Sequence, residues 1–291
     1  MAPLSLRSTF KLNSGFELPL LGFGIYQTPP AETEEIVLKA FAAGYRHIDS
    51  AAAYGNEEGA GNAIRKSGIP RSEIFFTSKV PPKNVSYDGA KKQVEESLKL
   101  SGLDYIDLFL LHAPFGGSEA RKGAWKALVE AVEAGKVRSI GVSNYGVHHL
   151  NELKQHIKEL EEERGGEGKG GVLSVGQWEI HPWLARTDIV EWSAKHNVAV
   201  EAYSPLVRGE RWGETTLKAL AEKYGVTEAQ VLVRWSLQKG HIPLPKSVTP
   251  SRITANVDVY GFELTADEVA ALETTEYKPV CWDPTKSPLN E

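Results

Sequence analysis

Four residues with side chains suited to acid–base chemistry follow successive apolar runs of the chain. Asp49, Lys79 and His112 each end such a run, and Tyr54 follows five residues after Asp49. The carboxyl ends of parallel strands meet at one side of a sheet or barrel. We therefore expect these four side chains to converge at one site.

A tyrosine beside a lysine and an aspartate is a candidate proton donor. The free phenol has a pKa near 10, roughly three units too high for easy proton exchange at neutral pH. We predict that the Lys79 ammonium lowers the pKa of Tyr54 and that Asp49 orients Lys79. Tyr54 would then act as a general acid, and neutral His112 would donate a hydrogen bond to the same substrate oxygen.

The segments that position these residues alternate between short apolar runs and longer amphipathic stretches. Continuous apolar runs that alternate with helices are typical of parallel strands buried on both faces. We predict eight strands, at Leu20–Gly24, Tyr45–Asp49, Ile74–Lys79, Ile106–His112, Ser139–Asn144, Leu173–Glu179, Ala199–Ser204 and His241–Lys246. The helices expected between them include Glu34–Ala43, Asn56–Ser67, Ala90–Leu100, Ala120–Ala134, Val147–Glu163, Thr187–His196 and Glu228–Lys239.

Eight units at a spacing of about 30 residues, with polar residues at many strand ends, favour a closed barrel over an open sheet. We predict an α/β protein in which residues 1–291 form a single (β/α)8 TIM barrel domain. Asn13-Ser14-Gly15 predicts an N-terminal β-hairpin over 10–19 that covers the barrel floor. The prolines after Tyr277 predict an irregular C-terminal loop.

Composition excludes several classes of protein. The formal charge of −5 argues against a nucleic-acid or anionic-membrane surface. A single cysteine, Cys281, rules out an internal disulfide and Cys-rich zinc sites, and it fits a reducing, cytoplasmic location. No signal peptide, membrane span or metal site is expected.

Six motifs, in this order along the chain, resemble the signatures of the aldo-keto reductase superfamily. They are GYRHIDSAAAYGNE at 44–57, TSK at 77–79, GVSN at 141–144, QWEIHP at 177–182, YSPL at 203–206 and PKSVTPSRITAN at 245–256. The resemblance implies that Asp49, Tyr54, Lys79 and His112 are the catalytic tetrad of an NADPH-dependent carbonyl reductase. It implies a small-molecule carbonyl substrate, no obligate protein partner and, as for many members, a monomer.

The same resemblance implies a set of cofactor-binding residues. Ser143, Asn144 and Gln177 would hold the nicotinamide carboxamide, and Tyr203 would stack on the ring. The remaining positions are Ser204 and Leu206 at the pyrophosphate, Lys246, Ser247 and Arg252 at a 2′-phosphate, and Asn256 at the adenine. Ala255 departs from the family, which usually has a glutamate there, and this weakens the expected hold on the adenosine.

The expected substrate pocket is lined by Tyr26, His112, Ala113 and Trp282. Ala113 stands where many relatives have tryptophan, so the pocket should be wider. The stretch LLHAPFGG, a Gly-rich connector and the tail around Trp282 look like fungal members that act on α-dicarbonyls, α-keto amides or keto-lactones. Trp183 is also expected at the rim.

The sequence also allows other interpretations. The glycines at 22–27 and 59–64 lack the third glycine of a Rossmann fingerprint and are rejected as nucleotide motifs. His148 and His149 are read as solvated surface residues. The protein is alternatively a nicotinamide-binding regulatory subunit with little turnover. A barrel aldolase that forms a Schiff base on Lys79 is a third possibility.

Overall fold

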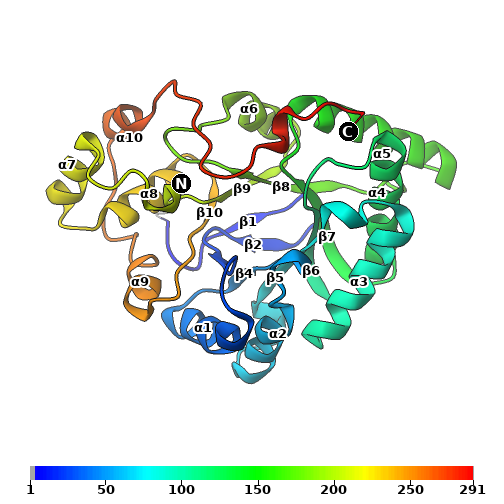
Figure 1. The fold of residues 1–291 in the computed structure, drawn as a ribbon, viewed down its shortest axis with the longest axis horizontal. Coiled ribbons are helices and arrows are strands. Elements are labelled where there is room, and N and C mark those ends of the chain that lie inside the picture. Colours follow the sequence, from blue (N-terminus) through cyan, green and yellow to red (C-terminus); the bar gives the residue numbers. More distant parts are fainter. Residues whose placement is uncertain (1–3, 291) are drawn as a thin grey trace.

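The computed structural model describes residues 4–290, which form a barrel of eight parallel strands in the order β10-β9-β8-β7-β6-β5-β4-β3. Figure 1 shows the strands as a central ring with the helices outside it. The strands are β3 (Phe23–Gly24), β4 (His47–Asp49), β5 (Phe75–Val80), β6 (Ile106–Leu111), β7 (Val137–Ser143), β8 (Leu173–Glu179), β9 (Ala199–Tyr203) and β10 (Ile242–Leu244).

Backbone hydrogen bonds between the first and last strands complete the ring. Gly22 N donates to Pro243 O and Gly24 N to Pro245 O, both at 3.1 Å. The predicted (β/α)8 barrel is therefore confirmed, and closure removes the exposed sheet edges that an open sheet would leave.

The predicted strand positions are correct, but the first and last strands are shorter than expected. Predicted strand 20–24 contracts to Phe23–Gly24 because the backbone amide of Leu20 instead donates to Ser8 O in the N-terminal segment. A periodicity pattern predicts the ends of a strand less precisely than the existence of the strand.

The helices pack around the ring and match every predicted helix. They are α1 (Pro30–Ala43), α2 (Glu57–Lys66), α3 (Tyr87–Ser101), α4 (Ser118–Glu133), α5 (Val147–Arg164), α6 (Thr187–Lys195), α7 (Thr215–Tyr224), α8 (Glu228–Gln238), α9 (Pro250–Ala255) and α10 (Ala266–Leu272). The unit after β9 contains two of these helices, α7 and α8, after a loop. Within residues 4–290, no helix combines the length and the apolar character needed to cross a membrane.

The predicted hairpin over the barrel floor is confirmed. Strands β1 (Thr9–Lys11) and β2 (Glu17–Pro19) pair antiparallel. Leu12 and Leu18 pack on the residues that begin the barrel strands: Phe75, Leu108, Leu110, Val175, Ala199 and Ile242. This apolar plug fills the lower barrel, so any cavity must lie at the other end.

The C-terminal segment after α10 is irregular, as predicted, apart from one 3-10 turn at Pro284–Lys286. It is drawn red in Figure 1 and crosses one side of the strand ring. Since the hairpin covers the floor, this segment lies near the mouth of the barrel, where the polar strand ends are.

Candidate active site

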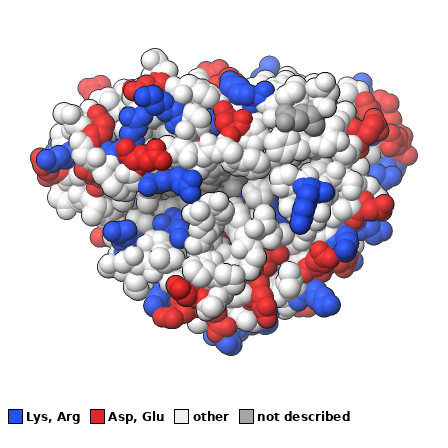
Figure 2. Space-filling view, in the orientation of Figure 1, with Lys and Arg blue, Asp and Glu red and all other residues white. Residues whose placement is uncertain are grey.

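A cavity of about 690 Å³ opens at the carboxyl ends of the barrel strands. Figure 2 shows basic side chains beside the hollow in the middle of this face. Most residues predicted from sequence line the cavity: Tyr26, Asp49, Tyr54, His112, Ser143, Asn144, Gln177, Tyr203, Ser204, Leu206, Lys246 and Trp282. Lys79 is fully buried immediately beneath it.

Asp49 and Lys79 form a buried ion pair at the base of the cavity. The Lys79 ammonium nitrogen lies 2.9 and 2.8 Å from the two Asp49 carboxylate oxygens and 2.8 Å from the Ser50 carbonyl oxygen. These hydrogen bonds fix the position of the Lys79 side chain inside the protein. The predicted orientation of Lys79 by Asp49 is therefore present.

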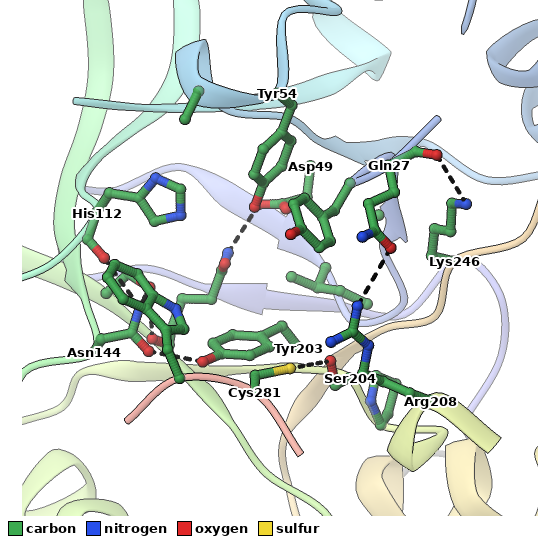
Figure 3. Close-up of a pocket in the computed structure, with 18 of the residues that line it drawn as sticks. Gln27, Asp49, Tyr54, His112, Asn144, Tyr203, Ser204, Arg208, Lys246 and Cys281 are labelled. Carbon is green, nitrogen blue, oxygen red and sulfur yellow. Dashed lines mark hydrogen bonds between the residues drawn. The ribbon is translucent and has the colours of Figure 1, made fainter. Parts of the chain in front are cut away.

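The Tyr54 hydroxyl lies 3.4 Å from Lys79 Nζ, and Figure 3 shows it pointing to the centre of the cavity. Burial, with a further contribution from Asp49, raises the pKa of Tyr54 well above its ordinary value. The expected lowering of this pKa by Lys79 is therefore wrong, since the shift is upward. Asp49 neutralises the ammonium, so desolvation of the phenolate prevails and Tyr54 keeps its proton.

Hydrogen bonds from buried polar residues fix the loop that carries Tyr54. The Asn56 side-chain amide donates to the Ile25 carbonyl at 2.8 Å, and its oxygen accepts from Ser50 Oγ at 2.8 Å. Ser78 Oγ donates to the Glu57 carboxylate at 2.6 Å. These contacts tie the start of α2 to three strand ends and hold the phenol in place.

His112 completes the tetrad on the far side of Tyr54. Its ring centroid is 5.8 Å from that of Tyr54, nearly perpendicular to it. Burial and the nearby Lys79 charge lower the pKa of His112 to about 3. The imidazole is therefore neutral at physiological pH and can donate a hydrogen bond from one nitrogen, as predicted.

A second polar group lies across the cavity from Tyr54 at the ends of β7, β8 and β9. Ser143 Oγ donates to the backbone carbonyl oxygen of Gln177 at 3.0 Å, and Tyr203 Oη donates to Asn144 Oδ1 at 2.9 Å. The Asn144 amide donates to His112 O at 3.0 Å. The structure thus brings together the residues predicted to hold a carboxamide and its ring.

Three residues bridge one end of the cavity, as Figure 3 shows. Arg208 donates to the Gln27 side-chain oxygen at 3.3 Å, and Lys246 Nζ donates to the Gln27 carbonyl at 3.4 Å. The loop from Ser204 to Arg208 includes three non-glycine residues with φ between 48° and 52°. A left-handed backbone conformation costs free energy in a non-glycine residue, and such residues often occur at functional sites. Here they turn the loop back over the cavity.

Three predicted cofactor residues lie beyond the cavity lining. Ser247 is buried and accepts a hydrogen bond from Thr249 N at 3.0 Å, and Asn256 is buried at the end of α9. Arg252 is exposed on the same short helix. Their roles therefore remain predictions.

The predicted substrate wall is largely present. The Tyr26 ring lies 5.0 Å from that of Tyr54, and the Trp282 ring lies 6.1 Å from His112. Both are about half exposed at the mouth, with 50% and 45% of their surface accessible. Ala113 is fully buried and is not part of the lining, so its assignment as a lining residue is wrong.

Two further expectations fail because the side chains are buried. Trp183 is not a rim residue: it packs in the core, with the Arg211 guanidinium 5.1 Å from its ring centroid. His149 is buried and its Nδ1 accepts from Gly146 N at 3.1 Å at the start of α5, while His148 is exposed as expected.

Sequence reasoning missed the residues that hold the C-terminal segment over the cavity. The fully buried Glu179 carboxylate accepts from the backbone amides of Val280 and Cys281 at 2.6 and 3.0 Å. The Arg186 guanidinium reaches Asp283 and Thr285, each at 2.9 Å. Nothing in the local pattern of QWEIHP indicates a partner about 100 residues away.

Comparison with known proteins places this arrangement in a family. The model of the aldo/keto reductase family matches residues 20–276. The chain belongs to the aldo/keto reductase family. The resemblance of its six motifs to that family is thereby confirmed.

Relatives in this family match the chain over nearly its whole length. It is 41% identical to an aldo-keto reductase of Mycobacterium sp. strain KMS, covering 91% of this chain and 92% of the relative. It is 39% identical to glyoxal reductase of Bacillus subtilis, covering 93% and 94% of the two chains.

Solved structures of the family show the same fold. An aldo/keto reductase from Brucella melitensis is 39% identical, with a TM-score of 0.83 over 91% of this chain and 98% of the other. An aldo-keto reductase of Bombyx mori in complex with NADP is 30% identical, with a TM-score of 0.83 over 96% of each chain.

Proposed function

We propose that this aldo/keto reductase uses NADPH to reduce aldehydes and ketones to alcohols, with Tyr54 as the proton donor. The observation that carries the proposal is the Tyr54 hydroxyl 3.4 Å from Lys79 Nζ, inside a cavity that also presents Ser143, Asn144 and Gln177.

The residues around the cavity fit a nicotinamide cofactor. Ser143, Asn144 and Gln177 would hold the carboxamide, and the Tyr203 ring would lie against the nicotinamide. When bound there, the dihydronicotinamide supplies a hydride. The bridge of Gln27, Arg208 and Lys246 would enclose the pyrophosphate end of the cofactor.

The tetrad can protonate the substrate oxygen as negative charge develops on it. Tyr54 and neutral His112 would both donate hydrogen bonds to the carbonyl oxygen and place it. An alkoxide is a stronger base than a phenolate, so the Tyr54 proton moves to it. The Lys79 ammonium, steadied by Asp49, then stabilises the phenolate that remains.

Cationic residues support NADPH over NADH. Lys246 borders the cavity and has no carboxylate within 4 Å among residues 4–290, and Arg252 likewise has no ion-pair partner there. Lys246 at the cavity and the exposed Arg252 on α9 are both suited to a dianionic 2′-phosphate. The related structure with bound NADP supports the same choice.

Activated carbonyls, such as α-dicarbonyls, are the substrate class that the site supports best. The aromatic wall of Tyr26 and Trp282 leaves a roomy cavity, and the Bacillus subtilis relative is named as a glyoxal reductase. An adjacent carbonyl group makes the reacting carbon more electrophilic, so hydride transfer to it needs less assistance from the Tyr54 acid.

The competing functions are less well supported. A Schiff-base aldolase needs an accessible neutral amine, whereas Lys79 is fully buried and bonded to both Asp49 oxygens. A regulatory subunit would not require the tetrad geometry. Steady-state kinetics with NADPH and NADH against aldoses, α-dicarbonyls, diketones and keto-lactones test the proposal. Binding of NADPH without turnover of any carbonyl would favour the regulatory alternative.

A further inference from the structure

A buried carboxyl group lies beneath the tetrad and has no part in the reaction described above. Glu201 is in the middle of β9 and is fully inaccessible to solvent. Its Oε2 accepts a hydrogen bond of 2.6 Å from Gln177 Nε2, and its Oε1 lies 3.5 Å from His47 Nε2 on β4.

The charges that face Glu201 do not balance if it is ionised. Asp49 and His47 face it from β4, Lys79 from β5 and neutral Gln177 from β8, while its neighbour on β10 is Ile242. The single buried ammonium, Lys79, is already bonded to both oxygens of Asp49. A second buried carboxylate without its own cation is costly, so the group must hold a proton.

The contacts of Glu201 place this proton on Oε1. Oε2 of Glu201 accepts from Gln177, which leaves Oε1 to carry the hydrogen on the side of His47, whose Nε2 lies 3.5 Å away. Burial together with Asp49 raises the pKa of Glu201 to about 8, and burial lowers the pKa of His47 to about 4. A neutral acid beside a neutral imidazole leaves no unpaired charge at this position.

The backbone opposite His47 is shaped to admit its ring. A Cβ atom on Gly22 would lie 2.6 Å from His47 Nδ1 and 2.4 Å from a Leu244 methyl carbon. Only glycine leaves this space free. The imidazole is therefore held tightly under Glu201.

This neutral pair determines which way the Gln177 amide faces. Gln177 Nε2 donates one hydrogen to Asp49 Oδ2 at 2.8 Å and the other to Glu201 Oε2 at 2.6 Å. With both hydrogens used below the cavity, the carbonyl oxygen Oε1 faces the cavity. That is the orientation needed to accept a hydrogen bond from a carboxamide N–H.

We propose that Glu201 is a positioning residue that holds a buried proton beside His47, orients Gln177 for the cofactor and keeps the charge beneath Tyr54 balanced. The inference rests on the proposed function for its effect on turnover. Loss of the proton at alkaline pH would place a second negative charge beside Asp49. A phenolate at Tyr54 would then be harder to form, and kcat would fall.

Glu201→Gln and Glu201→Leu separate the contributions of charge and hydrogen bonding. The glutamine is neutral, like the protonated acid, and keeps an acceptor for Gln177, so we expect kcat at pH 7 within about twofold of wild type, as for other conservative hydrogen-bond replacements. Its activity should also persist at the alkaline pH where the wild type declines. Glu201→Leu frees Gln177, so Kd for NADPH should rise roughly tenfold, the value of one hydrogen bond.

Measurements that need no turnover complete the test. Infrared spectra of the wild type at pH 6 should contain the carbonyl band of a buried protonated carboxyl, which disappears towards pH 9 and is absent from Glu201→Gln. NADPH affinity is followed by fluorescence. Circular dichroism checks that each variant is folded.

The two proposals fail in different ways. If no carbonyl is reduced but the infrared band and NADPH affinities behave as expected, the reductase assignment fails and the buried proton of Glu201 stands. If the enzyme reduces carbonyls but Glu201→Gln shows the same alkaline decline as wild type, or the band is missing at pH 6, the role of Glu201 is overturned.

Discussion

The Tyr54 hydroxyl is protonated because burial outweighs a neighbouring ammonium whose charge Asp49 cancels. Lys79 nevertheless lies 3.4 Å away, ready to stabilise the phenolate once charge moves to it. The pair therefore acts on the transition state more than on the resting enzyme, which is the requirement for raising kcat.

Removing this one hydroxyl should abolish turnover while leaving cofactor binding intact. For Tyr54→Phe we expect kcat to fall by about 10²–10⁴-fold, the usual contribution of general acid catalysis, with Kd for NADPH nearly unchanged. Stopped-flow kinetics and fluorescence titration measure the two quantities. Tyr26→Phe, which removes a phenol from the same cavity, is the matched control and should stay within a few-fold of wild type. Comparable turnover by Tyr54→Phe would refute its role.

The choice of cofactor should depend on two cations. Lys246→Ala and Arg252→Ala should each weaken NADPH binding by about 10–100-fold, because a hydrogen bond to a charged group contributes roughly 1.5–3 kcal/mol. NADH has no 2′-phosphate and should be little affected. Lys239→Ala, on an exposed lysine paired with Glu273, is the control. Equal losses for both cofactors would contradict the phosphate assignment.

At the scale of elements, the irregular C-terminal segment forms part of the cavity because residues on the β8 side hold it. Glu179 accepts from the segment's backbone, and Arg186 donates to its side chains. Trp282 is thereby kept against His112. The aromatic wall is thus set by contacts between elements and not by any regular structure of the tail itself.

Loosening this attachment should affect the carbonyl substrate more than the cofactor. For Arg186→Met, which keeps an unbranched apolar stem but loses the guanidinium and its hydrogen bonds, we expect KM for the carbonyl to rise about tenfold, equivalent to one charge-assisted hydrogen bond. Kd for NADPH should change by less than about twofold, since the hydrogen bonds of Arg186 to the tail go to Tyr277, Asp283 and Thr285 and to none of the predicted cofactor-binding residues. An unchanged KM would show that Trp282 does not depend on this attachment.

At the scale of the whole molecule, the barrel separates stability from chemistry. The hairpin and the strand starts form an apolar floor, whereas the strand ends hold the charged tetrad. Substitutions at the two ends should therefore have different consequences.

Truncation in the floor should lower stability and leave catalysis unchanged. Leu18 is fully buried, so Leu18→Ala should reduce the free energy of unfolding by about 2–5 kcal/mol. Urea denaturation measures this loss, and kcat at 25 °C serves as the internal comparison. A matched loss of kcat in the folded variant would show that the floor and mouth are coupled.

The buried proton of Glu201 should also be visible in the pH dependence of stability. The folded state keeps this proton up to a pH of about 8, whereas the unfolded carboxyl loses it near its ordinary pKa of 4.5. Between these values, wild-type stability should fall with rising pH by up to about 1.4 kcal/mol per unit relative to Glu201→Gln. Parallel stability curves for the two proteins would show that Glu201 carries no proton.

The sequence by itself determined the barrel, the residues of the tetrad and most of the cavity lining. Strand and helix periodicity is local, and the carboxyl ends of parallel strands must share one mouth, so Asp49, Tyr54, Lys79 and His112 could be brought together without coordinates. Only the tertiary structure decided the protonation of Tyr54, the burial of Trp183 and Ala113, and the partners of Glu201 and Glu179. These features depend on desolvation and on contacts between residues distant in the chain, such as the hydrogen bond from the Cys281 backbone amide to the Glu179 carboxylate. No pattern of neighbouring residues encodes such contacts.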